Sequence, residues 1–430
     1  MAEKGARRPK GPPVTSLVTS LSHANLAAQF SEQMTLAVIP IVAVIALGAS
    51  AEQTASLQAA TTLPFLLLSL PAGVLADRYR RKPLMVATEL LRALALLGLF
   101  ALFRAHLLTL SALGMLGFAM ATGTVVFGAA APSLVAALID PADLLTANRR
   151  LEIARSIAFT AGPALGGLFA GWASGTLAFA IAFVLSIASV YCLTRLPAEA
   201  PRVASRRHFL RELAEGVRFI AHSPYLRPIV ATAFVFNTSW YLLLAIFAYY
   251  AIHSLAFSAQ AVGIALGVYG FGMVCGAFGY RRVAKQLSFG RQIVLGPACA
   301  VIASLLMVTT WRLSGGALTY GVVFAAFFLF GFGPIVWTIS TTSLRQVVTP
   351  GGLIARVSAV TMTATAGARP FGAFLGAWLA STLGTRYCLV AVAVGFAVQL
   401  GIIVFSPASR LSAIEAVSLD TVATAQVPAA

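Results

Sequence analysis

The segment Gly73–Lys82, GVLADRYRRK, lies between two long apolar runs and carries one acidic and four basic residues in its last six positions. Lys and Arg resist translocation across a membrane, so short basic loops between apolar spans stay in the cytoplasm and orient the chain. The segment therefore predicts a cytoplasmic turn between two membrane spans. Read alone, it is also compatible with an ordinary basic loop, and the rest of the chain has to decide.

The composition of the 430-residue chain favours a membrane protein, because 59% of its residues are hydrophobic and only 10% are charged. Soluble domains have about a quarter charged residues, and so few charges could not cover a water-exposed surface. We therefore expect an all-α polytopic membrane protein. The four cysteines lie far apart in apolar runs, without metal-binding or disulfide spacing, so we expect no metal site and no cofactor.

Apolar windows of about 20 residues, the length that crosses a bilayer, predict twelve transmembrane helices. They cover residues 17–47, 53–75, 84–103, 107–138, 148–171, 174–194, 226–252, 258–280, 291–311, 316–343, 354–381 and 385–405. The first apolar run is longer than a signal-peptide core, so we expect this span to be retained.

The basic residues gather on one side of these spans. With the N-terminus in the cytoplasm, 25 of the 30 Lys and Arg residues fall on the cytoplasmic side, three on the other side and two within spans. This asymmetry predicts that both termini are cytoplasmic, in a multi-pass protein of a bacterial inner membrane. The net charge of +17 then reflects orientation in the lipid bilayer, and we expect no nucleic-acid partner.

The longest interruption, at residues 195–225, divides the spans six and six. It is basic and contains an amphipathic stretch, Phe209–Ala221, whose apolar positions follow helical spacing. Two halves with equal numbers of spans are typical of transporters built from parallel repeats. The predicted parts are a cytoplasmic tail at 1–16, a six-helix bundle at 17–194, the cytoplasmic linker at 195–225, a second six-helix bundle at 226–405 and a disordered cytoplasmic tail at 406–430.

Glu32 lies at the middle of the first span, where a charged side chain costs about 3 kcal/mol. Ser22, Asn25, Gln29 and Glu32 recur at helical spacing and make one face polar, which predicts that this face lines a cavity. Burial favours the neutral form of a carboxyl, so such an acid can exchange protons near neutral pH. We interpret Glu32 as a proton-coupling acid or as an acid that binds a cationic substrate. The alternative is a hydrogen-bonded residue that holds helices together.

Arg369 is a second charge within the spans, near the middle of span eleven and next to Pro370. It shares a helix face with Thr361 and Thr365. An arginine cannot shed its charge, so it requires an anion, backbone carbonyls or water. The sequence leaves three roles open: attraction of an anionic substrate, pairing with Glu32 across the two halves, or bracing of the helix.

Two acid–base pairs have i, i+3 spacing, namely Glu89–Arg92 in the inner part of span three and Glu152–Arg155 at the start of span five. Neighbours at this spacing meet on a helix surface. We interpret both as structural ion pairs near the cytoplasmic surface.

The opening segment resembles the loop between the second and third helices of the major facilitator superfamily, G-x-x-x-D-R/K-x-G-R-R/K. The matching residues are Gly73, Asp77, Arg78, Arg81 and Lys82, whereas Arg80 replaces the second glycine of the pattern. This departure concerns the detail of the gate that the loop forms in that superfamily.

The run GPALGG in span five resembles the G-P-x-x-G-G signature of drug/proton antiporters in the same superfamily. The matching residues are Gly162, Pro163, Gly166 and Gly167. The resemblance favours export over import. A face of small residues that lets helices pack closely is the alternative interpretation.

Further stretches resemble the enterobactin-exporter-like branch, which includes macrolide-efflux relatives, and Glu32 stands where that branch tends to have aspartate. They are Leu63–Pro64, Glu89–Arg92, Leu145–Asn148, Leu210–Phe219, Val348–Pro350 and Arg356–Val360. Together they make the resemblance continuous over most of the chain.

The resemblance implies a fold of two pseudo-symmetric six-helix bundles that rock about a central site and expose it to one side at a time. Spans one, four, seven and ten would line that cavity. The residues expected there are Asn25, Gln29, Asn237, Trp240, Tyr241, Trp337 and Thr341. Asp77 would lie near the start of span eleven, where the helix dipole favours an anion. Gly73, Arg78, Arg81 and Lys82 would complete this cytoplasmic gate.

No serine-hydrolase, metalloprotease or phosphate-binding glycine motif occurs in the sequence, so we expect no enzyme and an ion gradient as the energy source. The prediction is a monomeric, proton-coupled exporter of an amphipathic small molecule such as a siderophore or an antibiotic. One rival is a proton-symporting importer. A rival from another class is a non-transporting membrane sensor or scaffold on the same fold.

Overall fold

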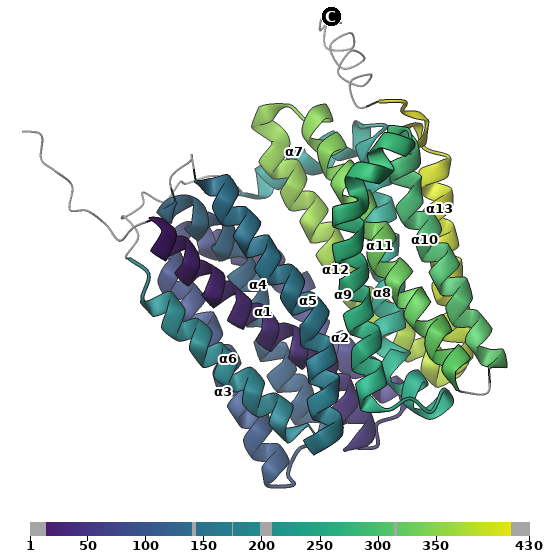
Figure 1. The fold of residues 1–430 in the computed structure, drawn as a ribbon. Coiled ribbons are helices and arrows are strands. Elements are labelled where there is room, and N and C mark those ends of the chain that lie inside the picture. The colour runs from purple at the N-terminus through teal and green to yellow at the C-terminus, as the bar shows by residue number, and fades with distance from the viewer. Residues whose placement is uncertain (1–13, 140–142, 174, 198–208, 314–315, 414–430) are drawn as a thin grey trace, which may run out of the picture.

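The computed structural model describes residues 14–139, 143–173, 175–197, 209–313 and 316–413 (Figure 1). Over these ranges the chain forms thirteen α-helices, three short 3-10 segments, one π-helical segment and no strand. The tails predicted at 1–16 and 406–430 lie in large part outside the described residues, whereas the linker predicted at 195–225 is described except for residues 198–208. The helical content and the helix order confirm the all-α prediction.

Twelve of the described helices correspond to the twelve predicted spans. The first six are α1 (Val14–Ile45), α2 (Ala51–Arg78), α3 (Arg81–Arg104), α4 (Leu110–Leu138), α5 (Leu144–Ala173) and α6 (Thr176–Thr194). The second six are α8 (Leu226–Tyr249), α9 (Ala259–Gln286), α10 (Phe289–Thr309), α11 (Ala317–Val348), α12 (Ile354–Thr382) and α13 (Thr385–Val404). Between the two sets lies α7 (Phe209–His222), and the short segments are η1 (Tyr250–Ser254), η2 (Thr310–Arg312), η3 (Gly351–Leu353) and η4 (Pro407–Arg410).

Eleven of the twelve long helices in the described chain are long and apolar enough to cross a membrane. The exception is α12, which carries Arg356 and Arg369 among many Ala, Gly and Thr residues. This helix packs against α2 on one side and α8 on another, so part of its polar surface is covered by protein. Its lower hydropathy is therefore compatible with a place among the spanning helices.

The basic segment at Gly73–Lys82 forms a tighter turn than the sequence predicted. α2 continues to Arg78, α3 begins at Arg81, and only Tyr79 and Arg80 separate them in extended conformation. The predicted helix ends at 75 and 84 are therefore each three residues short. The helices extend into the segment because no glycine or proline interrupts it between Val74 and Lys82.

The segment predicted as a disordered tail begins with ordered residues. η4 follows α13, and the next residues return to the start of α10. There the amides of Phe289 and Gly290 donate to the carbonyl oxygens of Ser412 and Leu411, at 3.2 and 2.7 Å. The first amides of a helix lack partners within the helix, and this return supplies them.

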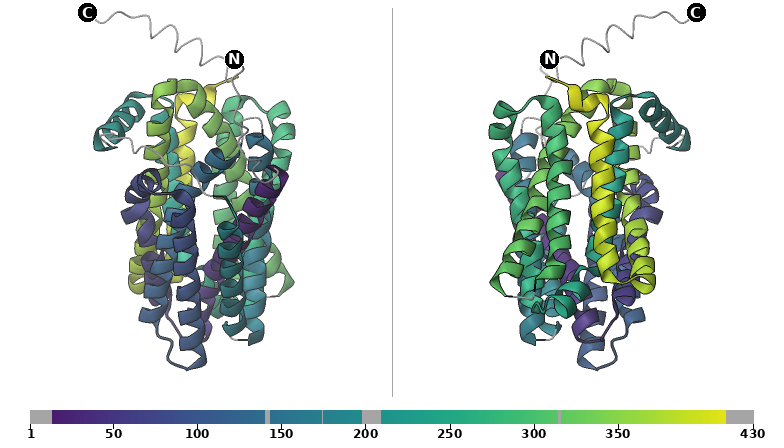
Figure 2. Two further views of the ribbon diagram at one scale, coloured as in Figure 1. Left: turned by 90° about the vertical axis from the view of Figure 1, so that its left-hand side faces the viewer. Right: turned by 90° about the vertical axis from the view of Figure 1, so that its right-hand side faces the viewer.

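The helices form two six-helix bundles that lie side by side, α1–α6 in one and α8–α13 in the other (Figure 1). α5 packs against α9 and α2 against α12, and these are the main contacts between the halves. The start of α1, α7 and η4 lie at one end of the molecule, which we call the terminal face (Figure 2). We call the other end the opposite face.

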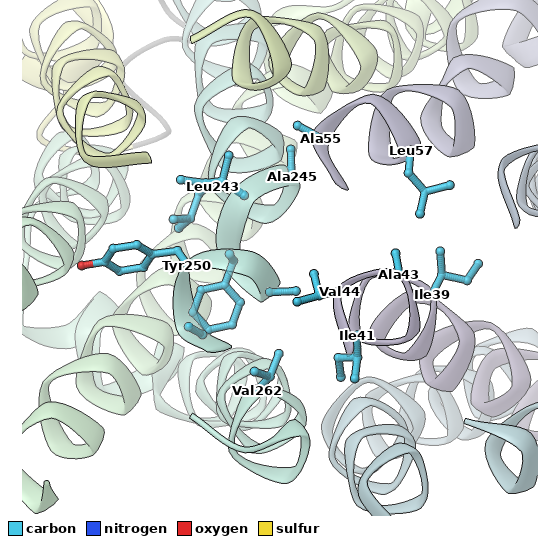
Figure 3. Packing of buried hydrophobic residues seen from close by; sticks show 14 of the residues in the cluster. Ile39, Ile41, Ala43, Val44, Ala55, Leu57, Leu243, Ala245, Tyr250 and Val262 are labelled. Atoms are coloured by element: carbon cyan, nitrogen blue, oxygen red, sulfur yellow. The ribbon is translucent and has the colours of Figure 1, made fainter. Parts of the chain in front are cut away.

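In the part of the chain that the structure describes, buried apolar side chains join the two halves only at the opposite face. One continuous cluster there includes Ile41 of α1, Leu57 of α2, Leu243 of α8 and Val262 of α9 (Figure 3). At the terminal face there are two separate clusters. One contains residues between Val18 and Leu196, and the other contains residues between Ile220 and Ala408. The halves are thus sealed at one end and have no shared core at the other.

Glycines bring α5 and α9 into direct backbone contact within this seal. A Cβ atom on Gly167 would lie 2.6 Å from both the Ala259 carbonyl oxygen and the Gly263 Cα atom. A Cβ atom on Gly263 would lie 2.6 Å from the Pro163 carbonyl oxygen. Small residues allow such an approach between membrane helices, so the two halves touch where neither has a side chain.

We predict that Gly167→Ala destabilises the protein by forcing α5 and α9 apart. Overpacking of this kind lowers the free energy of unfolding by about 1–3 kcal/mol. Gly401→Ala in α13 is the matched control, because a Cβ atom there meets no atom within 4 Å. Thermal unfolding of the purified proteins should show a lower midpoint for Gly167→Ala than for Gly401→Ala. Equal midpoints would contradict the proposed close contact.

Candidate functional site

Arg92 of α3 lies between two carboxylates inside the N-terminal bundle. Its Nη1 atom is 2.6 Å from Glu89 Oε1, and its Nη2 atom is 3.6 Å from Glu32 Oε2. The guanidinium also donates to the Ala28 carbonyl oxygen at 3.2 Å and to Thr124 Oγ1 at 2.8 Å. Arg92 thereby links α1, α3 and α4 through one buried group, which we call the Arg92 network.

The two acids of the Arg92 network have different surroundings. The Glu89 side chain is completely buried, whereas 18% of the Glu32 side chain is exposed. Glu32 also makes the longer contact with the arginine. A carboxyl that is loosely held and partly accessible can exchange a proton more easily than one that is enclosed. Within this network, Glu32 is therefore the acid with access to the solvent.

The structure changes the interpretation of the Glu89–Arg92 pair. We expected a structural ion pair near the cytoplasmic surface, and the pair is present but buried, with Glu32 as a third member. Its i, i+3 spacing was visible in the sequence. The contact with Glu32, sixty residues away, depends on how α4 and α6 hold α1 and α3 in the bundle, and no local pattern signals it.

Serine and glycine contacts fix α1 around Glu32. Ser31 donates to the Ala182 carbonyl oxygen of α6 at 2.8 Å and lies 2.9 Å from Ser186 Oγ. On another side, α5 approaches α1 through Gly162 and Gly166. A Cβ atom on Gly166 would lie 2.9 Å from the Met34 carbonyl oxygen. The residues on either side of Glu32 are thus held by α6 and by α5.

The GPALGG run of α5 serves two interfaces at once. Gly162 and Gly166 face Gln33 and Met34 of α1, whereas Gly167 faces α9 in the other half. Adjacent glycines therefore place α5 against the helix that carries Glu32 and against the C-terminal bundle. In the structure these glycines therefore act as a face of small residues that lets helices pack closely, which was the alternative interpretation of the run.

Arg369 of α12 contacts aromatic rings from both halves. Its guanidinium carbon lies 4.3 Å from the centre of the Phe65 ring of α2 and 5.3 Å from that of Tyr241 of α8. A guanidinium at this distance is attracted by the electrons of the ring face. Among the described residues Glu32 pairs with Arg92 and not with Arg369. Pairing with Glu32 across the halves, one of the three roles left open for Arg369, therefore does not occur in this structure.

The expected cavity-lining residues have varied surroundings. Asn25 donates to the Leu151 carbonyl oxygen at 3.3 Å, while Asn237 and Thr341 donate to carbonyl oxygens of their own helices. Gln29, Tyr241 and Trp337 are half-buried. Trp240 is 6% exposed and stacks on Tyr269 with ring centres 4.7 Å apart. Further contacts with Phe327 and Phe330 place Trp240 in the core of the C-terminal bundle.

The basic segment contacts its own half in this structure. Lys82 donates to the carbonyl oxygens of Thr194, at 2.9 Å, and of Leu196, both at the end of α6. Arg81 is buried, Arg78 is exposed, and Gly73 has open space where a Cβ atom would lie. The side chain of Asp77 lies outside the described residues.

The start of α12, where we expected Asp77, is in contact with α7. Arg356 pairs with Glu212 at 3.7 Å and with Glu215. Gly216 allows the close approach, because a Cβ atom there would lie 2.9 Å from the Arg356 carbonyl oxygen. The linker helix thus binds the terminal end of α12 through two acids.

The family comparison covers nearly the whole chain. A family model described as transmembrane secretion effector matches residues 15–429. The enterobactin exporter EntS of Escherichia coli O1:K1 / APEC is 25% identical over 297 residues, which are 66% of this chain and 67% of EntS. The uncharacterized MFS-type transporter y4rN of Sinorhizobium fredii (strain NBRC 101917 / NGR234) is 22% identical over 266 residues. That match is 60% of this chain and 63% of y4rN, so it spans less than two thirds of this relative.

The fold has a close counterpart among solved structures. A bacterial homologue of the iron transporter ferroportin, in an inward-facing state, superposes with a TM-score of 0.72 at 16% sequence identity. The match covers 91% of this chain and 99% of that one. At this identity the likeness concerns the fold alone, and it confirms the predicted two-bundle architecture. The nearly complete family match shows that this chain belongs to the transmembrane secretion effector family of major facilitator transporters.

Proposed function

We propose that this transporter is a proton-coupled exporter of an amphipathic small molecule in a bacterial inner membrane. The observation that carries the proposal is the sharing of Arg92 between Glu89 and Glu32. With both carboxyls ionised this group has a net charge of −1, and one bound proton makes it neutral. An unbalanced charge within a membrane is costly, so the network favours uptake of a single proton.

Glu32 is the proposed carrier of that proton. It is the more accessible acid, and its contact with Arg92 is long enough to be released without breaking the Glu89–Arg92 pair. Protonation of Glu32 would weaken its attraction to Arg92 and loosen α1 from α3. A membrane potential of 100 mV supplies about 2.3 kcal/mol for each charge that crosses, which corresponds to an approximately 50-fold concentration ratio.

Two features support export as the direction of transport. The GPALGG run resembles the signature of drug/proton antiporters, and the relative EntS is named as an enterobactin exporter. A siderophore such as enterobactin and a macrolide antibiotic are therefore the first cargo candidates. No observation in the structure favours the importing alternative or a non-transporting scaffold.

We assign the terminal face to the cytoplasm, because 25 of the 30 Lys and Arg residues fall in the tails and loops on the same side of the spans as the termini. The shared apolar core at the opposite face and the separate cores at the terminal face support an inward-open state. In this state Arg369 belongs to the closed part of the path, since its ring contacts link α2 with α8 and α12. Release of Phe65 would accompany opening toward the outside.

The first prediction from this proposal concerns Glu32→Gln, which removes the proton site and keeps the size of the side chain. In inside-out vesicles with an acidic lumen, the wild type should accumulate enterobactin or erythromycin. The uptake rate of the variant should be at least about tenfold lower than that of the wild type. Exchange of labelled for unlabelled cargo without a gradient should persist, because the proton step is not needed for it.

Glu52→Gln is the matched control for this experiment, because Glu52 is exposed in the first turn of α2. It should transport as the wild type does. Gradient-driven uptake by Glu32→Gln at the wild-type rate would refute proton coupling at this residue. Expulsion of cargo from the acidic lumen by the wild type would instead identify an importer.

The second prediction concerns the proposed cytoplasmic gate. We propose that Asp77 binds the start of α12 when the terminal face closes, in place of the α7 acids that contact Arg356 here. Asp77→Asn should lower the turnover rate about tenfold while the affinity for cargo stays within about twofold. Asp143→Asn, at the same face, serves as the control. An equal loss of turnover and affinity would argue for a binding role of Asp77.

A further inference from the structure

A cavity of about 310 Å³ lies inside the N-terminal bundle, toward the terminal face. Its thirteen lining residues come from α1, α3, α4, α5 and α6, and none comes from the C-terminal half. We call it the N-half cavity. Pockets for whole small molecules range from about 300 to 1,000 Å³, so this one is large enough for part of a cargo molecule.

The lining of the N-half cavity combines apolar walls with a polar rim. Nine residues are apolar, among them Met85, Phe127 and Ala131. The four polar residues are Asn25, Asn148, Glu152 and Arg155. Sites that bind small molecules have this character, with apolar walls and a few polar groups that fix orientation.

Glu152 and Arg155 form a tight ion pair at the rim. Arg155 Nη2 donates to Glu152 Oε1 at 2.7 Å, and Arg155 Nε donates to Oε2 at 3.0 Å. Both side chains are about half exposed, with 41% for Arg155 and 59% for Glu152. The sequence suggested a structural pair near the surface, but an ion pair on the wall of a cavity remains accessible to a ligand.

The same ion pair also borders the space between the halves. A narrower cavity beside it is lined by Glu152, Arg155 and residues of the other bundle, including Met273 and Ile335. A molecule whose apolar part fills the N-half cavity would therefore present its polar part toward the C-terminal half.

We propose that the N-half cavity is a cargo subsite that holds an acyl or aryl group joined to an uncharged hydrogen-bonding group, such as an amide or a hydroxyl. The rim has no net charge, because Glu152 balances Arg155. Asn25 donates to the Leu151 carbonyl oxygen and keeps its own amide oxygen as an acceptor, and the amide of Asn148 can both donate and accept. A charged group there would leave one charge without a partner. The inference rests on the proposed function and specifies the chemistry of its cargo.

The location of the subsite has a consequence for transport. Because all its walls belong to one bundle, rocking of the two halves would not pull them apart. Cargo held there would move with the N-terminal half, while its polar part loses or gains contacts with the other half. Such a subsite would bind the cargo while the path between the two halves closes to one side of the membrane and opens to the other.

Three benzophenone probes of nearly equal shape can test the subsite, namely 4-benzoylbenzamide, 4-benzoylbenzoate and 4-benzoylbenzylammonium. On irradiation the ketone inserts into nearby C–H bonds, and peptide mapping of the full-length protein in lipid nanodiscs identifies the labelled residues. Saturable labelling around Met85 is expected, with the amide binding about tenfold more tightly than either ion. A preference for an ion, or no saturable labelling at Met85, would overturn the proposal.

Matched variants separate the location from the charge. Ala131→Phe fills the cavity and should abolish labelling, whereas Ala136→Phe, on an exposed face of the same helix, should leave it unchanged. Arg155→Gln should shift the preference toward the ammonium probe, and Glu152→Gln toward the benzoate probe. Labelling of Ala131→Phe at the wild-type level, or no shift in preference, would refute the subsite.

The labelling experiment uses no proton gradient, so it is independent of coupling at Glu32. Glu52→Gln, which changes an exposed side chain outside both cavities, should bind the amide probe as the wild type does. If gradient-driven transport fails while labelling meets these expectations, the proposed function is wrong and the subsite stands. If transport succeeds while Ala131→Phe still labels, the subsite is wrong and the function stands.

Discussion

The charge of Arg92 is the constraint that organises the N-terminal bundle. Arginine cannot become neutral in a protein, so a buried guanidinium must be surrounded by acceptors. In this chain the acceptors come from α1, α3 and α4, which brings three helices to one point. Two carboxylates meet the single cation, and this excess of negative charge distinguishes the network from a purely structural ion pair. A balanced pair would have no need of a proton.

The glycines of α5 connect this charge network with the interface between the halves. Gly166 lies against the backbone of α1 two residues beyond Glu32, and Gly167 lies against α9. Backbones in direct contact, without intervening side chains, cannot shift independently of each other. A movement of α1 that follows a change in charge at Glu32 would therefore reach the other bundle through one turn of α5. This short path links the proposed proton site at Glu32 with the seal between the halves.

Much of the fold could be predicted from the sequence, because apolar length and basic asymmetry act locally along the chain. Glu32 was also predictable, since an acid in the middle of a span is costly wherever it points. Its partner Arg92 was not, because the contact depends on the rotation of α3 against α1. Likewise Trp240 looked like a cavity residue from its polar neighbours. In the structure Trp240 points into the aromatic core, where it contacts Tyr269 and Phe327. Its polar and aromatic neighbours in the sequence do not determine which face of the helix turns inward.

The position of Arg369 shows why tertiary contacts also decide the role of a charge. Three roles were open in the sequence, and in the structure the guanidinium faces the aromatic rings of Phe65 and Tyr241, while its buried Nε atom has no hydrogen-bond partner. The attraction between a guanidinium and a ring face is worth about 0.5–2 kcal/mol. A contact of this strength suits a surface that would separate in every cycle of the proposed transport. The stronger Glu89–Arg92 pair, by contrast, lies within one bundle, where the rocking of the halves does not disturb it.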